Sequence, residues 1–409
     1  MYKKCRICVN CGRCSGTGGE SQKPEVITEH VLDIPSGPIE GRNGERLVTV
    51  DIGTTTIAMQ LYGTDGRCVD TFVTVNPQVQ YGADVLSRIT QARDRAKAAH
   101  MKALVRGVLQ KGTERFKALL QEGERLVMVL AANTTMVYLL MGWEPAELGQ
   151  APFCASRLQA FCTVLTADEI PCYVFPGLSA FVGGDIVAGM QAVELPYRKE
   201  LTLLIDLGTN GEIVLGNEDR IAACATAAGP AFEGGVNRGI WGADMVWLTA
   251  CLRQRGVLDE TGLLEEEYLE NGIRIGDVCV TQSAIRALQC AKAAIAAGIG
   301  ILAERFAISF REIDKVILAG GFGYYLKPAS AAEIGLLPEE LTDRTIAGGN
   351  TALAGALLMG RRLIGRMPKE ERLEELMGVK DVEIINLAEE EQFPQHYLQA
   401  MKLTKLGKY

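Results

Sequence analysis

The chain has 409 residues, of which 48% are hydrophobic and 22% are charged, and its formal net charge is -8. This length and composition are typical of a folded protein with two or three domains. The acidic balance argues against a nucleic-acid-binding surface, which needs a basic patch. No uncharged apolar run reaches the length of a membrane span, and the first residues lack the apolar core of a signal peptide. We therefore expect a cytoplasmic protein that binds neither nucleic acid nor a membrane.

The first twenty residues are dense in cysteine. Four of them follow the spacing C-x2-C-x2-C-x2-C, namely Cys5, Cys8, Cys11 and Cys14. The spacing is similar to the bacterial ferredoxin run that binds a 4Fe-4S cluster, although its last gap is shorter and no proline follows. A zinc site is the alternative, but zinc-binding Cys pairs are usually separated by a long loop. We predict an iron–sulfur head over residues 1–20, followed by a Pro- and Gly-containing linker over 21–46 with a short strand near residues 26–32.

One sequence pattern occurs twice, 155 positions apart. Residues 47–62 read LVTVDIGTTTIAMQLY and residues 202–216 read TLLIDLGTNGEIVLG. An apolar run broken by a short Gly-containing turn predicts a β-hairpin, and glycine allows the turn to approach a ligand closely. A single hairpin of this kind is also typical of an ordinary β-meander. Two copies indicate an internal duplication with two facing lobes and a nucleotide between them.

Each copy supplies candidate site residues of two kinds. Asp51 and Asp206 lie at strand ends, where a carboxylate can hold Mg²⁺ directly or through water, and we predict them to be catalytic. The turns supply amides and hydroxyls that can bind phosphate oxygens. The predicted phosphate-binding residues are Gly53, Thr54, Thr55, Gly208, Thr209 and Asn210.

The residues between the two copies predict helix over 82–122 and a buried strand over 126–132. Asn133 and the two threonines after it either face the cleft or cap a helix, and we favour the cap. Cys154, Cys162 and Cys172 have irregular spacing, so we interpret them as small core residues.

Stretches rich in small residues follow both halves of the duplication. In residues 176–190, PGLSAFVGGDIVAGM, Asp185 is an acid in an apolar context, and we favour a catalytic carboxylate over a helix-terminal acid. Residues 346–359, IAGGNTALAGALLM, repeat the small-residue pattern, and both stretches are predicted to be helices whose backbones pack closely.

Two Gly-rich segments of the second half are candidates for binding the nucleoside. Residues 222–235, AACATAAGPAFEGG, predict a loop whose Gly229 amide cradles the nucleotide, while Glu233 contacts a ribose hydroxyl or is merely a first-turn acid. Residues 316–323, VILAGGFG, predict a strand that enters a turn on the adenine side. The cofactor-binding residues of that turn would be Gly320, Gly321 and Gly323.

The order of these motifs resembles the ASKHA superfamily of ATPases, which includes acetate and sugar kinases, Hsp70 and actin. DIGTTT and DLGTNGE look like the two phosphate loops of that superfamily, and LAGGFG looks like its adenosine loop. The two small-residue segments look like its connecting helices. The second of these segments contains Asn350, which the resemblance implies to be a cofactor-binding residue. The resemblance implies a duplicated, ribonuclease H-like α/β fold. Its lobes would span residues 47–200 and 201–365, with a C-terminal extension over 366–409.

Four segments resemble a narrower family, the reductive activators of corrinoid enzymes. Their sequences are DLGTNGEIVLG, TAAGPAFEGG, ILAGGFG and, near the C-terminus, INLAEEEQF. That resemblance implies a homodimer in which ATP hydrolysis drives an electron from an iron–sulfur centre to the Co(II) corrinoid of a methyltransferase or corrinoid protein. It implies ATP, Mg²⁺ and a 4Fe-4S cluster as cofactors and a donor such as ferredoxin. The chain departs from better-known members of that family, which carry a larger ferredoxin-type domain.

Three other functions remain open from the sequence, one of which is a nucleotide-gated interaction protein similar to Hsp70 and without redox chemistry. The chain is also similar to the ATP-driven electron injectors of dehydratases and of double-cubane proteins. A small-molecule kinase of the same fold would use Asp185 as its catalytic acid, but it would give no role to the cysteine head.

Overall fold

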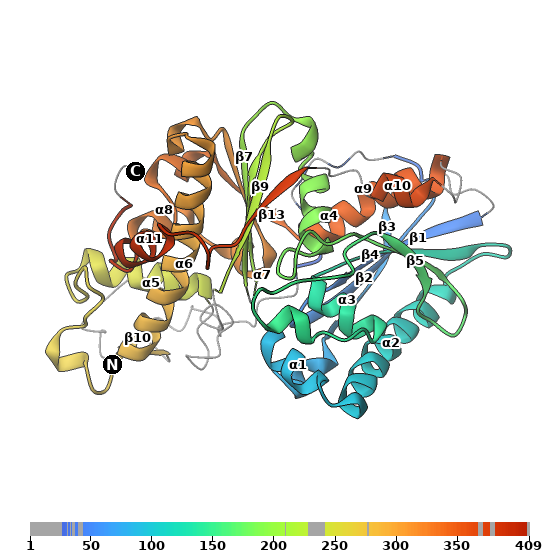
Figure 1. Cartoon of the computed structure of the whole chain (residues 1–409), viewed down its shortest axis with the longest axis horizontal. Helices are drawn as coiled ribbons and strands as arrows, with labels where there is room; N and C mark the ends of the chain where they lie inside the picture. The colour runs from blue at the N-terminus through green and yellow to red at the C-terminus, as the bar shows by residue number, and fades with distance from the viewer. Residues whose placement is uncertain are drawn as a thin grey trace, which may run out of the picture.

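The computed structural model describes residues 27–30, 32, 34, 37–39, 44–208, 210–227, 242–275, 278–366, 371–376 and 381–406. Two six-stranded sheets organise these residues, one in each of two lobes (Figure 1). The four predicted cysteine ligands lie outside the described residues.

The first sheet has the strand order β3-β2-β1-β4-β6-β5. Its strands are β1 (Glu45–Ile52), β2 (Thr56–Tyr62), β3 (Cys68–Val75), β4 (Arg125–Ala132), β5 (Phe161–Val164) and β6 (Pro171–Val174). The first three strands form an antiparallel meander, and β4 and β6 continue the sheet parallel to β1. The nearly continuous apolar runs of β1 and β4 follow from burial on both faces of the sheet.

The second sheet repeats this plan in the order β13-β12-β7-β8-β9-β14. Its strands are β7 (Thr202–Leu207), β8 (Gly211–Gly216), β9 (Ile221–Thr226), β12 (Lys315–Ala319), β13 (Thr345–Gly349) and β14 (Val382–Ile385). Again three antiparallel strands are followed by two strands parallel to the first. The two sequence copies thus form the same two strands of two equivalent sheets, β1–β2 and β7–β8.

The outer face of the first sheet is covered by α1 (Val85–Ala92), α2 (Arg95–Lys117) and α3 (Thr134–Met141), with a shared apolar core. The single helical region predicted over 82–122 is two helices. Asp94 separates them because its side chain accepts hydrogen bonds from the backbone N–H groups of Ala96 and Lys97 and so starts a new helix.

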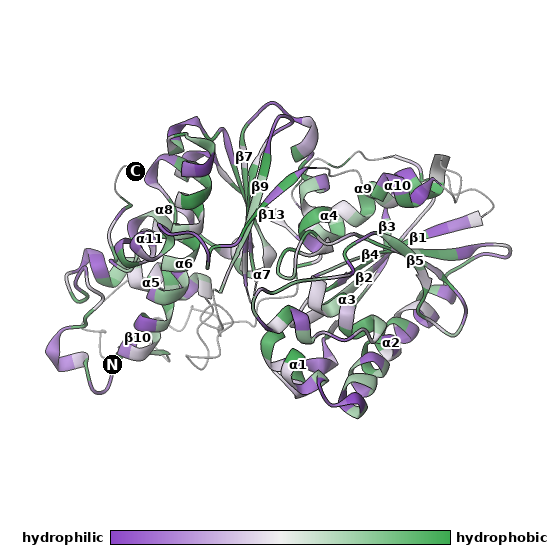
Figure 2. Ribbon diagram, viewed as in Figure 1, coloured by the Kyte–Doolittle hydropathy of each residue, from purple (hydrophilic) through white to green (hydrophobic). Residues whose placement is uncertain are grey.

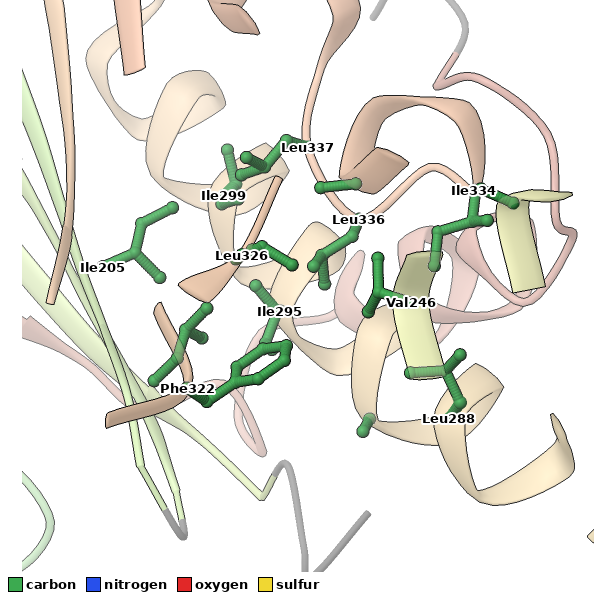
Figure 3. Packing of buried hydrophobic residues seen from close by; sticks show 14 of the residues in the cluster. Ile205, Val246, Leu288, Ile295, Ile299, Phe322, Leu326, Ile334, Leu336 and Leu337 are labelled. Carbon is green, nitrogen blue, oxygen red and sulfur yellow. The ribbon is translucent and has the colours of Figure 1, made fainter. Parts of the chain in front are cut away.

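The outer face of the second sheet is covered by α5 (Gly242–Gln254), α6 (Gln282–Phe306), α7 (Gly320–Tyr325) and α8 (Pro328–Glu333). In Figure 3, Phe322 of α7 and Ile295 of α6 lie between Ile205 of β7 and Val246 of α5, and all four belong to one apolar core. Among the described residues, α6 is the one helix long and apolar enough to cross a membrane, yet 83% of its apolar window is buried inside the protein. Its apolarity is therefore explained by its place in the core.

Smaller elements complete the described chain. A two-stranded sheet is formed by β10 (Ile273–Ile275) and β11 (Val278–Val280), and α11 (Phe393–Ala400) packs on α6. The 3-10 turns are η3 (Pro77–Tyr81), η4 (Ala146–Gly149), η5 (Leu195–Tyr197), η7 (Glu266–Tyr268), η8 (Phe310–Glu312) and η9 (Glu339–Arg344).

Two helices, α4 (Gly184–Ala192) and α9 (Thr351–Arg366), lie between the sheets and belong to one apolar core with both of them (Figure 1). Figure 2 colours α4 mainly as hydrophobic, whereas α10 (Arg372–Leu376), at the outer edge, is hydrophilic. A Cβ on Gly355 of α9 would strike the carbonyl oxygen of Ala188 in α4. Small residues are therefore needed in both predicted helices, because larger side chains would prevent the two backbones from coming into contact.

These helices differ in extent from the predictions. Within residues 176–190, helix begins only at Gly184, and within 346–359 the first residues form β13, so α9 begins at Thr351. Although α9 falls within the residues predicted for the second lobe, it packs on β1 and β4 of the first.

The predicted linker and C-terminal extension are also joined to the lobes. In the described part of the linker, Ile39 is buried in the core between the sheets, and the Gly37 carbonyl accepts a hydrogen bond from Arg361 of α9 at 3.1 Å. Of the residues predicted to form a short strand near 26–32, those that the structure describes make one β-bridge, between His30 and Gly349. The extension adds β14 to the second sheet, and its Arg372 forms a buried ion pair with Glu45 of β1 at 2.8 Å.

The interpretation of the three scattered cysteines is right for one of them. Cys172 is buried in β6, whereas Cys154 and Cys162 are exposed. Cys162 points outward because alternate residues of the edge strand β5 face solvent.

Candidate functional site

The first hairpin turns between Asp51 at the end of β1 and Thr56 at the start of β2. The Gly53 N–H donates to the Thr56 carbonyl at 2.9 Å and closes the turn. In the register of the hairpin, Asp51 lies opposite Ala58. Thr55 is exposed at the tip, whereas the Thr54 side chain is turned inward and buried.

Two asparagines outside the hairpin hold this turn in shape. The Asn76 amide, fully buried after β3, donates to the Gly53 carbonyl at 2.8 Å, and the Asn76 N–H donates to the Thr55 carbonyl at 2.8 Å. Asn133 accepts from the Met136 N–H at 2.9 Å and donates from its amide to Thr54 Oγ1 at 3.2 Å. Asn133 is therefore both the predicted helix cap and a contact of the phosphate-loop candidate. Asn76 was not predicted, since nothing in its own neighbourhood of the sequence marks it.

The second hairpin has one residue fewer in its turn. The Gly208 N–H donates to the Asn210 carbonyl at 3.0 Å, and Asp206 lies directly opposite Glu212 on the neighbouring strand. Residues opposite each other on antiparallel strands have adjacent side chains, so two carboxyl groups meet here where the first hairpin has Asp51 and Ala58. Glu212 was missed in the sequence, although its signal was an acid in DLGTNGE where DIGTTTIA has alanine.

Asp185 is brought to the same place by the start of α4. It stands in the first turn of that helix, where the helix dipole favours a negative charge. A Cβ on Gly183, the cap residue, would collide with the backbone of Asn133 and Thr134. The two glycines before Asp185 thus allow α4 to begin against the end of β4, beside the first hairpin.

Four carboxyl groups from β1, α4, β7 and β8 therefore converge between the lobes. Burial raises the pKa of Asp51 to about 6, and burial together with the charges of Asp206 and Asp51 raises the pKa of Asp185 to about 7. Burial and the Asp51 charge raise the pKa of Asp206 to about 7. The pKa of Glu212 is also raised, by burial and by the charges of Asp185 and Asp206, despite a hydrogen bond from Asn210. Buried carboxyl groups with pKa values raised by burial and by neighbouring acids form a candidate site for a cation.

The predicted adenine-side turn lies over Asp206. Gly320 has a φ of +78°, and a Cβ there would come within 2.5 Å of Asp206 Oδ1 and 2.6 Å of the Leu207 carbonyl. Gly321 is exposed with no atom within 4 Å of its Cβ position, while Gly323 is buried against Leu318. The segment is the first turn of α7 rather than a free loop.

Asn350 joins the site from the opposite side, at the start of α9. Its side-chain amide donates to Asp51 Oδ2 at 2.8 Å, which favours the ionised form of that carboxyl, and its Oδ1 accepts from the Leu353 N–H at 2.8 Å. The structure thus brings together Asp51, Asp185, Asp206, Gly320 and Asn350 with both hairpin turns. The remaining predicted residues, Thr209, Gly229 and Glu233, lie outside the described residues.

This arrangement fits magnesium and a nucleoside triphosphate in the chemistry of its donors. Carboxylates are hard oxygen ligands of the kind Mg²⁺ uses, usually one or two of them together with water and phosphate oxygens. Within the described part of the chain, no three His, Cys, Asp or Glu side chains lie close enough to hold an ion by themselves. Gly321 has open space at its Cβ position, and Gly208 and Asn210 of the second turn are each half-buried.

The fold and the site define a two-lobed ATPase-type domain of the ASKHA class, and relatives support this. Residues 47–198 match the family described as the RACo middle region, and residues 200–245 and 236–408 match the C-terminal domain of RACo, the ASKHA domain. The chain belongs to the RACo family. The resemblance to reductive activators of corrinoid enzymes and the duplicated α/β fold are thereby confirmed.

Three relatives illustrate the relationship. The chain is 30% identical to the corrinoid activation enzyme RamQ of Eubacterium limosum, over 76% of this chain and 63% of that protein. It is 38% identical to the Co(II) methylated amine-specific corrinoid protein reductase of Methanosarcina barkeri, but over only 16% of this chain and 12% of the relative. A solved structure, the reductive activator for corrinoid,iron-sulfur protein, superposes with a TM-score of 0.75 at 26% identity, covering 89% of this chain and 67% of that one. The chain thus spans less than two thirds of the length of RamQ.

Proposed function

We propose that this protein is an ATP-dependent reductive activator of a corrinoid protein. It binds ATP with Mg²⁺ between the lobes and couples hydrolysis to the delivery of one low-potential electron, which converts Co(II) of the partner's corrinoid to Co(I). The observation that carries the proposal is the convergence of four carboxyl groups between two facing hairpins in a member of the RACo family.

Different residues between the lobes have different roles in phosphoryl transfer. Asp51 and Asp206 hold Mg²⁺ directly or through water, and the turns at Gly53–Thr55 and Gly208–Asn210 bind the β- and γ-phosphates. Glu212 and Asp185, both carboxyls with raised pKa values, orient the attacking water, and Glu212 accepts its proton. Most of the catalysis is positioning and charge stabilisation, since phosphoryl transfer asks little covalent chemistry of the protein.

Electron delivery belongs to the cysteine head. The four thiolates of Cys5, Cys8, Cys11 and Cys14 suit a 4Fe-4S cluster, which supplies a one-electron carrier of low potential when bound. A reduced ferredoxin or a similar donor returns one electron to it for each electron passed on. We further propose a cytoplasmic homodimer, and light scattering of the purified protein tests its subunit number.

The decisive experiment combines the purified full chain with a Co(II) corrinoid protein and a low-potential reductant in the absence of air. We expect the Co(I) absorbance to appear only with ATP and Mg²⁺. Cys8→Ser should hydrolyse ATP but fail to reduce the corrinoid, whereas Asp206→Asn should keep its iron but lose hydrolysis. Protein that contains no iron after anaerobic purification, or that phosphorylates a small molecule instead, contradicts the proposal.

A further inference from the structure

The described residues 27–30, which we call the anchor segment, are attached to the edge of the nucleotide cleft through three consecutive carbonyl groups. The Ile27 carbonyl accepts from the Asn350 side-chain amide at 3.2 Å, and the Thr28 carbonyl accepts from the Gln60 amide at 3.2 Å. The Glu29 carbonyl accepts from the backbone N–H of Asn350 at 3.0 Å. His30 then pairs with Gly349 in an antiparallel bridge.

The backbone at Gly349 is shaped for this contact. Gly349 has a φ of +73°, and a Cβ there would strike the Glu29 carbonyl and the Cα of His30. A side chain at this position would therefore push the anchor segment away from the strand. Close approach of two backbones at a glycine indicates a built contact rather than a chance one.

Asn350 is the point where the anchor segment meets the site. Its amide Nδ2 has two hydrogens, and it donates to both the Ile27 carbonyl and Asp51 Oδ2, at 3.2 and 2.8 Å. Its Oδ1 caps α9 at the Leu353 N–H. One planar side chain thus links a carboxylate of the cleft, a helix of the lobe interface and the anchor segment, and it cannot rotate without changing all three.

The anchor segment follows the four cysteines closely in sequence. Thirteen residue steps separate Cys14 from Ile27, a span of at most about 45 Å when fully extended. The anchor segment is therefore, in sequence, the first described part of the chain after the four cysteines.

We propose that Asn350 is a positioning residue that couples occupation of the nucleotide site at Asp51 to attachment of the anchor segment. A cation or its bound water at Asp51 competes for the carboxylate oxygen to which Asn350 donates, so the two states of the site differ in their contacts to Asn350. A ligand shifts a conformational equilibrium only through such a difference, and the coupling is reciprocal. The inference rests on the proposed function, since it takes Asp51 as a group that meets the metal nucleotide.

Hydrogen–deuterium exchange of the full chain tests this coupling, with and without Mg²⁺ and a non-hydrolysable ATP analogue. The Asn350 N–H donates to Glu29, so peptides covering residues 348–354 report attachment directly, and peptides containing the anchor segment report it from the other side. In the wild type we expect the nucleotide to change exchange in both sets of peptides.

Two variants separate coupling from simple attachment. Asn350→Ser keeps a helix-capping side chain but is too short to reach Asp51 and Ile27. Gln60→Met removes the donor to Thr28, together with the acceptor of the Tyr62 hydroxyl, and leaves Asn350 and Asp51 untouched, so it costs the anchor segment one hydrogen bond. Both should speed exchange of the anchor segment roughly fivefold, the effect of losing one hydrogen bond. Only Asn350→Ser should abolish the response to nucleotide.

The outcomes are distinguishable. If the analogue protects the hairpin peptides at 51–57 and 206–216 but leaves the wild-type anchor segment unchanged, the coupling is wrong and the nucleotide site stands. A nucleotide response that survives in Asn350→Ser also overturns it. If the hairpin peptides are not protected either, the proposed nucleotide site fails and the inference falls with it.

Discussion

The two hairpins share their backbone plan but differ in what surrounds them. In the first, Asp51 faces Ala58, and asparagines from other elements hold the turn and the carboxylate through Gly53, Thr54 and Asp51 itself. In the second, Asp206 faces Glu212. The duplication has therefore produced one turn that is braced from outside and one that carries an acid pair. This asymmetry suggests that the first hairpin mainly holds the nucleotide and the second mainly acts on it.

The largest effect is expected at the acid pair. Glu212→Gln should lower kcat for ATP hydrolysis roughly 100-fold with little change in KM, because a general base is lost while the ligand contacts remain. Steady-state hydrolysis assays measure both constants. Glu218→Gln, an exposed acid beyond the same strand, is the matched control and should be unaffected. Equal effects of the substitutions at Glu212 and Glu218 would contradict the role of Glu212 as a general base, and with it the proposed difference between the two hairpins.

The raised pKa values predict a pH dependence with opposite signs for binding and stability. Asp51 and Asp206, with pKa values of about 6 and 7, must both be ionised to hold a cation. Affinity for the metal nucleotide should therefore fall by about tenfold between pH 7 and 6, where Asp206 takes up a proton, and by about a hundredfold per pH unit below pH 6, where both carboxyls do. Calorimetric titration between pH 5 and 8 measures this. An affinity that stays constant over the range contradicts the role of the carboxylates.

Stability of the ligand-free protein should change the other way. Between about pH 4 and 7 the folded state binds more protons than the unfolded state, because the folded pKa values are raised, so stability is lost as pH rises through this window. Asp185→Asn should flatten this slope in thermal unfolding experiments and raise Tm at pH 8. If the dependence of stability on pH were unchanged in this variant, the pKa of Asp185 would not be raised in the folded protein.

The two adjacent glycines over Asp206 give a smaller, paired test. Gly320→Ala should destabilise the protein by about 1–3 kcal/mol, because its Cβ would press on Asp206 and its φ is positive. Gly321→Ala meets no atom and should keep full stability while weakening nucleotide binding. Denaturant unfolding and a nucleotide titration separate the two effects. Equal destabilisation by both substitutions would contradict the close contact.

The smallest effect is expected from the hydrogen bond between Asn133 and Thr54 of the first hairpin. Asn133→Ser keeps a cap for α3 but loses the donor to Thr54, so ATP affinity should fall a few-fold at nearly unchanged stability. Asn133→Ala loses both and should cost about 1 kcal/mol more in the free energy of unfolding. Should Asn133→Ser bind ATP as the wild type does, the asparagine is a cap alone.

Local patterns in the sequence were sufficient for much of the site. The repeated apolar–Asp–Gly–Thr stretches predicted both hairpins, since a run of β-forming residues and a glycine turn act over a few residues. The small residues of 176–190 and 346–359 predicted close helix packing, which Gly355 and Ala188 make. The helix starts inside these segments were missed because glycine-rich stretches carry a weak helix signal.

The sequence by itself determined that two equivalent hairpins exist and that acids stand at their strand ends, because strand periodicity and turn chemistry are local properties. Only the tertiary structure decided that Glu212 faces Asp206, that Asn76 and Asn133 brace the first turn, and that Asn350 joins Asp51 to Ile27. These contacts join residues as much as 323 positions apart, and they exist because α4 and α9 bring the two sheets together.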